Sequence, residues 1–159
     1  MIKKLYLPLI GAAAFIILVG LLTKSPTKFG LVKDSPTKIK VGNAEIEVKL
    51  ANTQEKRTKG LSETTTLKEN EGMIFVFDKK DVTPSFWMKD MLIPIDIIWI
   101  NDGKIVKIDK NVAPPSKNTS DSDLPFYKPD TPVDYVLEVP AGFSDKNSLI
   151  VGSETKFDL

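Results

Sequence analysis

The chain has 159 residues and a formal net charge of +1, and it contains no cysteine and no histidine. It therefore has no disulfide framework, no thiolate or imidazole metal ligand and no Ser-His-Asp triad, so any chemistry must use carboxylates, lysine, arginine, hydroxyls or an oxygen-bound metal. Residues 1–37 hold five lysines and one aspartate, whereas residues 38–159 hold 17 cations and 20 anions, a net charge of −3. This acidic part lacks the basic surface of a nucleic-acid-binding protein, so we expect no nucleic-acid partner.

The first segment is a candidate membrane anchor. Residues 5–22 (LYLPLIGAAAFIILVGLL) carry no charge, and about 18 helical residues span about 27 Å, close to the hydrocarbon core of a bilayer. No small-x-small cleavage pattern follows, so we expect an uncleaved transmembrane anchor rather than a cleaved signal peptide or a buried helix. Residues 1–4 then form a cytoplasmic tail and the domain is extracytoplasmic, although lysines flank both ends of the run and charge alone does not decide the orientation.

A flexible tether is expected at residues 23–37, and a β-rich domain at residues 38–159. In residues 38–51 apolar and charged side chains alternate around Gly42-Asn43, which predicts a β-hairpin. We expect Asn52 to cap a short helix over residues 53–59 that ends at Gly60.

The rest of the domain consists of short apolar runs between turn residues. Such runs predict strands at residues 73–77, 86–89, 92–100, 104–110, 134–140 and 149–151. Residues 101–103 form a hairpin signal, residues 111–132 a proline-rich loop, and residues 141–147 one helical turn. The pattern predicts a mainly β domain, a small β-sandwich or barrel with one or two short helices.

Several motifs in this order resemble the domain of unknown function 192 family. They are Arg57…Gly60-Leu61, EGMIFVF at residues 71–77, FWMK at residues 86–89, IPIDI at residues 93–97, YVLE at residues 135–138 and Ala141-Gly142. The resemblance implies a sandwich of jelly-roll-like architecture, often exported or membrane-anchored, but no established activity. Ser62, Asp90-Met91 and Ser153 depart from the family pattern, which puts any family function of those positions in doubt.

Asp96 is the unusual residue of the sequence because it lies inside the apolar run PIDIIWI. An unpaired buried carboxylate costs several kcal/mol, so a partner is expected: Arg57, Lys89 or backbone N–H groups. A structural ion pair or capped turn is one interpretation. A ligand-binding or acid–base carboxylate in a cleft is the other.

Five further residues are candidates for ligand binding. Trp87 and Lys89 share one face of a predicted strand and can line a pocket for an anionic or sugar ligand, and Arg57, Glu63 and Asp90 complete the set. Each has an ordinary alternative, as a surface or edge residue. Trp99 is expected in the core and Glu138 in solvent. No cofactor is expected, and no metal site, since residues 121–130 lack the spacing of a calcium loop.

Three functions remain open from the sequence. A non-catalytic module could bind a small polar ligand, a glycan or a partner protein at the cell envelope, and the missing histidine and cysteine favour this hypothesis over an enzyme. A hydrolase of envelope polysaccharide would need two carboxyls about 5–9.5 Å apart, such as Asp96 with Glu63 or Asp90. A structural accessory protein would use the same residues only to stabilise its fold.

Overall fold

The structure, a computed structural model, describes residues 36–157 and 159. Within these residues, nine strands and two short α-helices follow one another, with a 3-10 turn at Asp121–Asp123. Their bounds are β1 Thr37–Val41, β2 Ala44–Ala51, α1 Gln54–Lys59, β3 Glu71–Val76, β4 Phe86–Trp87, β5 Ile95–Asn101, β6 Lys104–Val112, β7 Phe126–Tyr127, β8 Tyr135–Pro140, α2 Phe143–Lys146 and β9 Thr155–Lys156. The expected mainly β domain with two short helices is confirmed.

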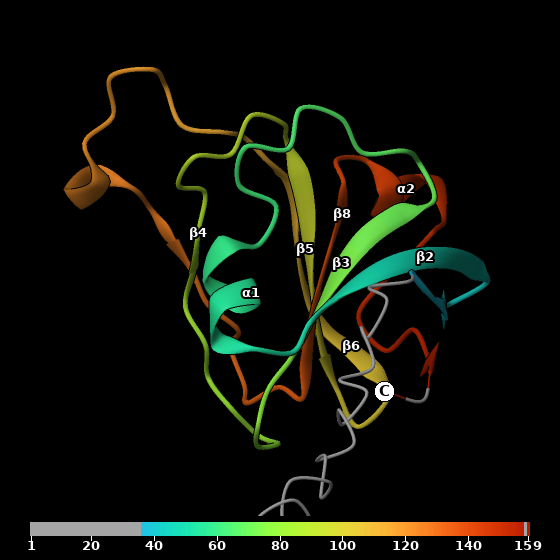
Figure 1. Cartoon of the computed structure of the whole chain (residues 1–159). Coiled ribbons are helices and arrows are strands. Elements are labelled where there is room, and N and C mark those ends of the chain that lie inside the picture. The colour runs from blue at the N-terminus through green and yellow to red at the C-terminus, as the bar shows by residue number, and fades with distance from the viewer. Residues whose placement is uncertain (1–35, 158) are drawn as a thin grey trace, which may run out of the picture. The chain divides into compact units, whose positions relative to one another are not determined.

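Seven strands form one sheet that curves almost into a barrel (Figure 1). The strand order is β6-β5-β8-β3-β2-β1-β9. A bridge between Lys104 and Glu154 brings the start of β6 next to β9, and the Ile105 N–H donates to Ser153 O at 3.0 Å. The two ends of the sheet are therefore joined at one rim, which leaves few strand edges open to water.

This single sheet differs from the expected sandwich of jelly-roll-like architecture. β2 and β3 run parallel, whereas the other neighbours in the sheet are antiparallel. A parallel pair needs a crossover connection, and α1 with residues 61–70 provides it. The short pair β4–β7 forms a separate ribbon. The barrel-like alternative describes the domain better than two stacked sheets.

Local turn chemistry explains the two hairpins. β1 pairs with β2 in a register that places Val41 opposite Ala44, so Gly42-Asn43 is a two-residue turn, and Gly42 has φ +56°. Asp102 and Gly103 make the β5–β6 turn with φ +46° and +68°. Asp102 and Gly103 thus both have the positive φ of a type I′ turn, whereas in Gly42-Asn43 only the first central residue has it, as in a type II′ turn. Both predicted hairpins are confirmed.

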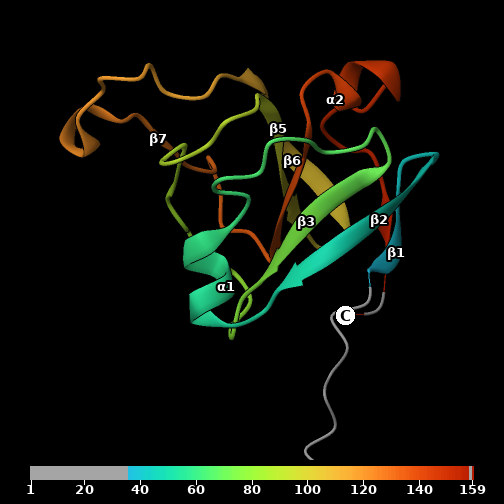
Figure 2. The ribbon, with the colours of Figure 1, turned by 45° about the horizontal axis from the view of Figure 1, so that its top comes forward.

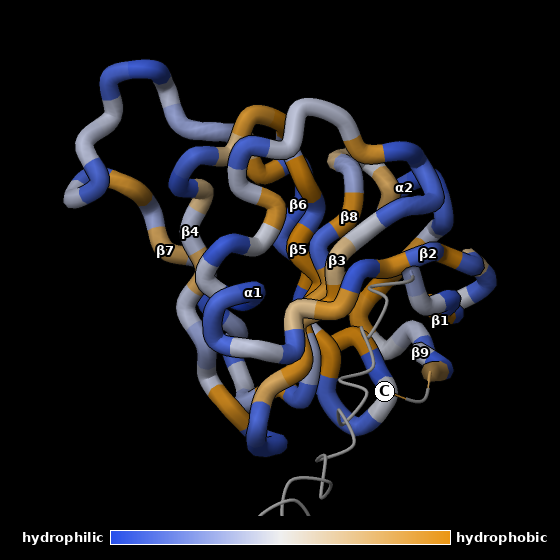
Figure 3. Tube along the Cα trace, viewed as in Figure 1, coloured by the Kyte–Doolittle hydropathy of each residue, from blue (hydrophilic) through white to orange (hydrophobic). Residues whose placement is uncertain are grey.

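Both faces of the sheet are buried at its centre. One face carries a cluster that includes Ile46, Ile74 and Leu137, and the other carries Phe75, Trp99 and Val136. In Figure 3 orange, apolar colour gathers where the strands of the sheet meet, whereas α1 is mostly blue and white. Strand β5 is buried on both faces, as the long apolar run around Asp96 predicts, and Trp99 lies in the core as expected.

Three local predictions were wrong. Thr53, not Asn52, caps α1, since its hydroxyl accepts the Lys56 N–H at 3.2 Å. The strand expected at residues 86–89 has only two residues, because its partner among the described residues is the equally short β7. Residues 149–151 are a loop and a turn, and the closing strand is β9 instead.

The predicted anchor at residues 5–22 lies outside the described residues, as does nearly all of the predicted tether. In the part of the chain that the structure describes, no helix is long and apolar enough to cross a membrane. The first strand begins at Thr37.

Candidate functional site

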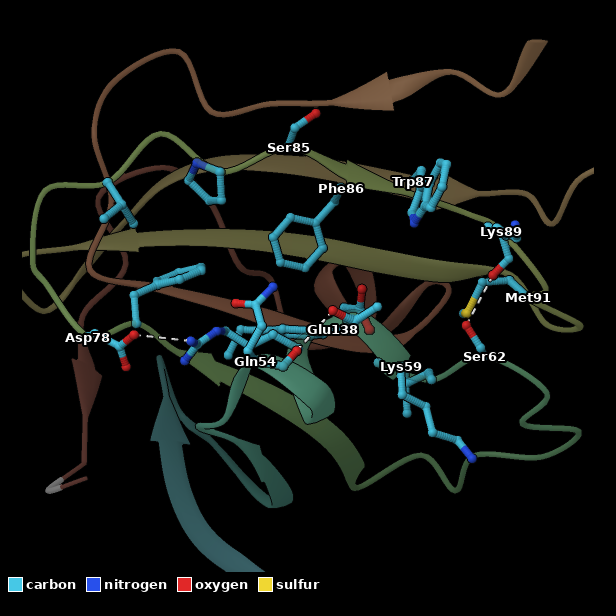
Figure 4. Close-up of a pocket in the computed structure, with 18 of the residues that line it drawn as sticks. Gln54, Lys59, Ser62, Asp78, Ser85, Phe86, Trp87, Lys89, Met91 and Glu138 are labelled. Atoms are coloured by element: carbon cyan, nitrogen blue, oxygen red, sulfur yellow. Dashed lines mark hydrogen bonds and ion pairs between the residues drawn. The ribbon is translucent and has the colours of Figure 1, made fainter. Parts of the chain in front are cut away.

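A cavity of about 540 Å³ lies on the face of the sheet that α1 covers. One wall is α1 with the turn after it, and the other is the segment of residues 77–91 that includes β4; residues of β3 and β8 form the floor. Figure 4 shows the lining side chains. They are Gln54, Arg57, Thr58, Lys59, Gly60, Leu61, Ser62, Phe75, Phe77, Asp78, Lys79, Val82, Pro84, Ser85, Phe86, Trp87, Lys89, Met91 and Glu138.

Arg57 holds α1 against the end of β3. Its Nη1 donates to Val76 O at 2.8 Å and its Nη2 lies 3.2 Å from Asp78 Oδ2. The guanidinium side chain is 13 % exposed, whereas that of Asp78 is 81 % exposed. Because Arg57 bonds the last residue of β3 and Asp78 just after it, it acts first as a clamp between α1 and this segment, with part of its surface on the cavity.

Two turns join the walls at the other end of the cavity. Ser62 Oγ donates to Lys89 O at 3.1 Å, and the Glu63 N–H donates to Asp90 O at 2.8 Å. Glu63 and Asp90 both have left-handed backbones, with φ +63° and +56°. Non-glycine residues rarely adopt this conformation, so the surrounding bonds hold both turns in place. Figure 4 shows Ser62 and Lys89 on the same side of the cavity.

The walls near the floor are aromatic. The Phe86 ring meets Phe75 edge-on with centroids 4.7 Å apart, and Trp99 at 5.5 Å. Leu61 and Met91 are also buried beside the cavity. These contacts give a rigid apolar surface that can cover the body of a small ligand.

Glu138 is the polar group at the floor. It is 6 % exposed, and its Oε2 has no hydrogen-bond partner. Burial raises the pKa of this carboxyl from 4.5 to about 8, so it is mainly protonated at neutral pH. Buried polar groups are nearly always hydrogen-bonded, and a carboxyl with a strongly raised pKa that lines a cavity is a candidate functional group.

Gly60 leaves the space in front of Glu138 open. A Cβ at this position would lie 3.4 Å from Phe75 Cζ and 3.9 Å from Glu138 Oε2. The residue also has φ +51° at the end of α1, which favours glycine. The backbone conformation therefore favours glycine here, while an added Cβ would make only ordinary van der Waals contacts with the cavity lining.

The prediction that Glu138 faces solvent was wrong. β8 is a central strand whose residues 136–139 are all buried. Val136 and Glu138 point to the same face, which α1 and residues 77–91 cover. The strand sequence alone did not reveal this cover; the signal that could have done so is that Glu138 interrupts a run of apolar residues in the same way as Asp96.

Trp87 and Lys89 form the rim of the cavity. Trp87 is 41 % exposed and stacks on Phe126 of β7 with ring centroids 5.8 Å apart. Lys89 Nζ lies 5.5 Å from the Trp87 ring centroid and pairs with Asp121. The predicted proximity of Trp87 and Lys89 is therefore observed, and the indole is open to any molecule that enters.

Asp96 lies outside the cavity, and backbone N–H groups donate hydrogen bonds to both of its carboxylate oxygens. Its Oδ1 accepts from the N–H groups of Asn111 at 2.9 Å and Gly142 at 3.2 Å, and its Oδ2 accepts from Ser144 at 2.9 Å. The residue is fully buried and does not line the cavity. Of its expected partners, the structure places the backbone N–H groups beside it rather than Arg57 or Lys89.

The six predicted site residues thus fall into three groups. Arg57, Trp87 and Lys89 line the cavity, Glu63 and Asp90 lie in the turns that join its walls, and Asp96 is remote. The described residues hold no cluster of three or more acidic, histidine or cysteine side chains that could bind a metal ion.

These features define a small, nearly closed β-barrel with a cavity on one side, which has aromatic side chains near its floor, charged side chains around it and a carboxyl at the floor. The chain belongs to the DUF192 family, a domain of unknown function described as an uncharacterized ACR, whose family model matches residues 37–157. The family resemblance that the motifs indicated is confirmed.

Two solved structures share the fold. One is a crystal structure from Sinorhizobium meliloti 1021 described as a "putative transcription regulator"; it is 27 % identical with a TM-score of 0.67, covering 77 % of this chain and 95 % of that one. The other is a protein of unknown function from Novosphingobium aromaticivorans DSM 12444, 25 % identical with a TM-score of 0.69, covering 85 % and 94 %. No curated protein matches the chain.

Proposed function

We propose that this domain is a non-catalytic module that binds a small molecule in the cavity between α1 and residues 77–91. The observation that carries the proposal is the carboxyl of Glu138, whose Oε2 is buried without a hydrogen-bond partner at the floor of the cavity. A buried polar group without a partner costs about 1–3 kcal/mol, a cost that a structural role would not explain. A ligand that supplies the missing bond recovers it.

The size and lining of the cavity favour a small ligand over a protein surface. About 540 Å³ is within the range of small-molecule sites. Because the inner part of the cavity around Phe75, Phe86 and Leu61 is apolar, we favour a ligand with an apolar body over a glycan, which needs polar partners around its ring. Trp87 at the rim supplies an exposed ring against which part of the ligand can pack.

The hydrolase alternative has less support. Among the lining residues only Asp78 and Glu138 carry carboxyl groups, and Asp78 is paired with Arg57. Asp96, the first choice for a catalytic carboxyl, has both oxygens bonded to backbone N–H groups. Neither pair considered from the sequence, Asp96 with Glu63 or Asp90, lies on this cavity.

Ligand-dependent stabilisation of the full chain in lipid nanodiscs tests the proposal. Small organic acids, amines, alcohols and sugars are screened by thermal unfolding, since a ligand that binds the native state raises the Tm by mass action. We expect hits that quench Trp87 fluorescence, with the quenching absent in Trp87→Phe and retained in Trp99→Phe. A screen without any such hit contradicts the proposal and favours the structural accessory role.

We further propose that the module is tethered to a membrane by residues 5–22 with its domain on the extracytoplasmic side. The uncharged apolar run supports this location. External protease added to intact cells should then degrade the domain, and the chain should stay with the membrane after an alkaline wash. Ala13→Arg combined with Ile17→Arg should release it, because each arginine costs about 2.5–3.5 kcal/mol at a bilayer centre. A protected or soluble wild-type domain refutes the location.

A further inference from the structure

The charges around the cavity are arranged unevenly. Four cationic side chains line it: Arg57, Lys59, Lys79 and Lys89. The carboxyls that line it are those of Asp78, which Arg57 neutralises, and Glu138 at the floor. The rim is therefore positively charged, and such a field attracts anions and disfavours cations.

The lysines of the rim are not fully neutralised. Lys59 lies 3.9 Å from Glu63, with both side chains more than two-thirds exposed, so the pair is weak. Lys89 pairs with Asp121, which is outside the cavity lining. Within the described residues, Lys79 is in no ion pair. At least one ammonium group is thus available to an entering anion.

The floor has the opposite character. No cationic group pairs with Glu138, and desolvation keeps its carboxyl protonated at neutral pH. A protonated carboxyl presents one O–H donor. Its natural partner is an acceptor oxygen, such as a ketone, ester or amide carbonyl, carried by the part of the ligand that reaches the apolar floor.

We infer that the ligand is an organic anion with an apolar body that carries an uncharged hydrogen-bond acceptor in its buried part. Its anionic group lies among the lysines that line the cavity, its body packs on Phe75 and Phe86, and its acceptor oxygen receives the hydrogen bond of Glu138. The inference rests on the proposed function, since it names the ligand class of the same cavity.

Three aromatic probes of similar size separate these features. 4-Phenylbutyrate and 4-phenylbutylamine differ in the sign of their charge. 3-Benzoylpropionate differs from 4-phenylbutyrate only by a carbonyl next to the ring. Binding of each to the full chain in nanodiscs is measured through Trp87 fluorescence. We expect the butyrate to bind at least threefold more tightly than the amine, and 3-benzoylpropionate roughly fivefold to tenfold more tightly than the butyrate, the worth of one hydrogen bond.

Matched variants assign each preference to a residue. Glu138→Met, similar in size, should abolish the preference for the carbonyl probe, while Glu138→Gln should keep it because an amide N–H still donates. Lys79→Met should weaken the binding of both anionic probes by roughly twofold to threefold. Lys40 is exposed and remote from the cavity lining, so Lys40→Met should change the affinity for neither probe. Circular dichroism of each variant checks that it is folded.

Each of the other outcomes contradicts one feature of the inferred ligand. Tighter binding of the amine refutes the anionic class. Equal binding of the two anions to the wild-type chain, or a carbonyl preference that survives in Glu138→Met, refutes the hydrogen bond. If none of the probes binds but the wider screen yields Trp87-quenching hits, the inference fails and the proposed function stands. If neither gives a hit, both fail.

Discussion

At the scale of single residues, two buried carboxyls have opposite surroundings. Asp96 receives three backbone N–H groups from segments that come together only in the folded chain. Glu138 has no partner for its Oε2. The first arrangement stabilises the fold, and the second costs stability that binding can recover. Burial alone therefore does not distinguish a structural carboxyl from a functional one; the hydrogen-bond partners do.

The raised pKa of Glu138 predicts a pH-dependent stability. Its pKa is about 8 in the folded chain and 4.5 without burial, so the folded state binds more protons between these values. The free energy of unfolding should fall as pH rises from about 4.5 to about 8, by on the order of 3 kcal/mol up to pH 7. Urea unfolding at several pH values measures it.

The matched control for this effect is Glu45, an exposed residue paired with Lys38. Glu138→Gln should flatten the decline between pH 4.5 and 8, because an amide does not titrate. Glu45→Gln should leave it unchanged. Equal slopes for wild type and Glu138→Gln would show that Glu138 is ionised in the folded chain.

Asp96→Asn should destabilise the domain by about 3 kcal/mol. An asparagine side chain offers one acceptor oxygen, so its NH₂ group must face a backbone donor that Asp96 now satisfies. Asp130→Asn, at an 80 % exposed side chain, should cost less than about 0.5 kcal/mol. Chemical denaturation compares the two, and similar values for both variants would refute the role of Asp96 as a backbone cap.

At the scale of elements, α1 connects the fold to the cavity. It lies in the parallel crossover from β2 to β3, and its first turn is capped by Thr53. Figure 2 shows α1 on the same side of the sheet as the β4–β7 ribbon, separated from α2. A six-residue helix has little intrinsic stability, so its cap and the Arg57 clamp hold the wall of the cavity in place.

Thr53→Ala should lower stability by about 1 kcal/mol, the usual value of an N-cap hydrogen bond. Thr53→Ser keeps the hydroxyl, so this variant should retain most of the stability that the alanine variant loses. Because α1 forms a wall of the cavity, Thr53→Ala should also weaken the binding of any ligand found in the screen. Urea midpoints and ligand titrations give both values; an alanine variant as stable as the serine variant contradicts the role of the cap.

At the scale of the whole described domain, the last strand closes the sheet. The N–H groups of Gly42, Ile105 and Thr155 donate to Glu154, Ser153 and Gly103 respectively, at 2.7–3.0 Å. These bonds connect segments that are up to about 110 residues apart along the chain. Without them β1 and the start of β6 would present open edges, and open edges promote association between chains.

A chain that ends at Gly152 should therefore lose about 3 kcal/mol of stability, roughly 1 kcal/mol for each closing hydrogen bond, and should associate. A chain that ends at Phe157 keeps β9 and serves as the control. Thermal unfolding and light scattering compare them. A monomeric chain of unchanged Tm after truncation at Gly152 refutes the closing role of β9.

Much of the element list follows from local chemistry. Gly42-Asn43 and Asp102-Gly103 suit tight hairpin turns, and the long apolar run of β5 around Asp96 indicates a strand buried on both faces. The motifs of the family also lie in local runs. Three candidate site residues, Arg57, Trp87 and Lys89, could be chosen for the same reason: each stands beside a recognisable element, and all three line the cavity.

The sequence by itself thus determined the β-rich class, the hairpins and the family, because turn chemistry and hydrophobic periodicity act over a few residues. Tertiary structure alone decided the parallel β2–β3 pair, the closure through β9, the backbone partners of Asp96 and the burial of Glu138. Each of these depends on which distant segment covers a strand. The face that Glu138 shares with Val136 is buried only because α1 and residues 77–91, more than 45 residues earlier in the chain, pack over it.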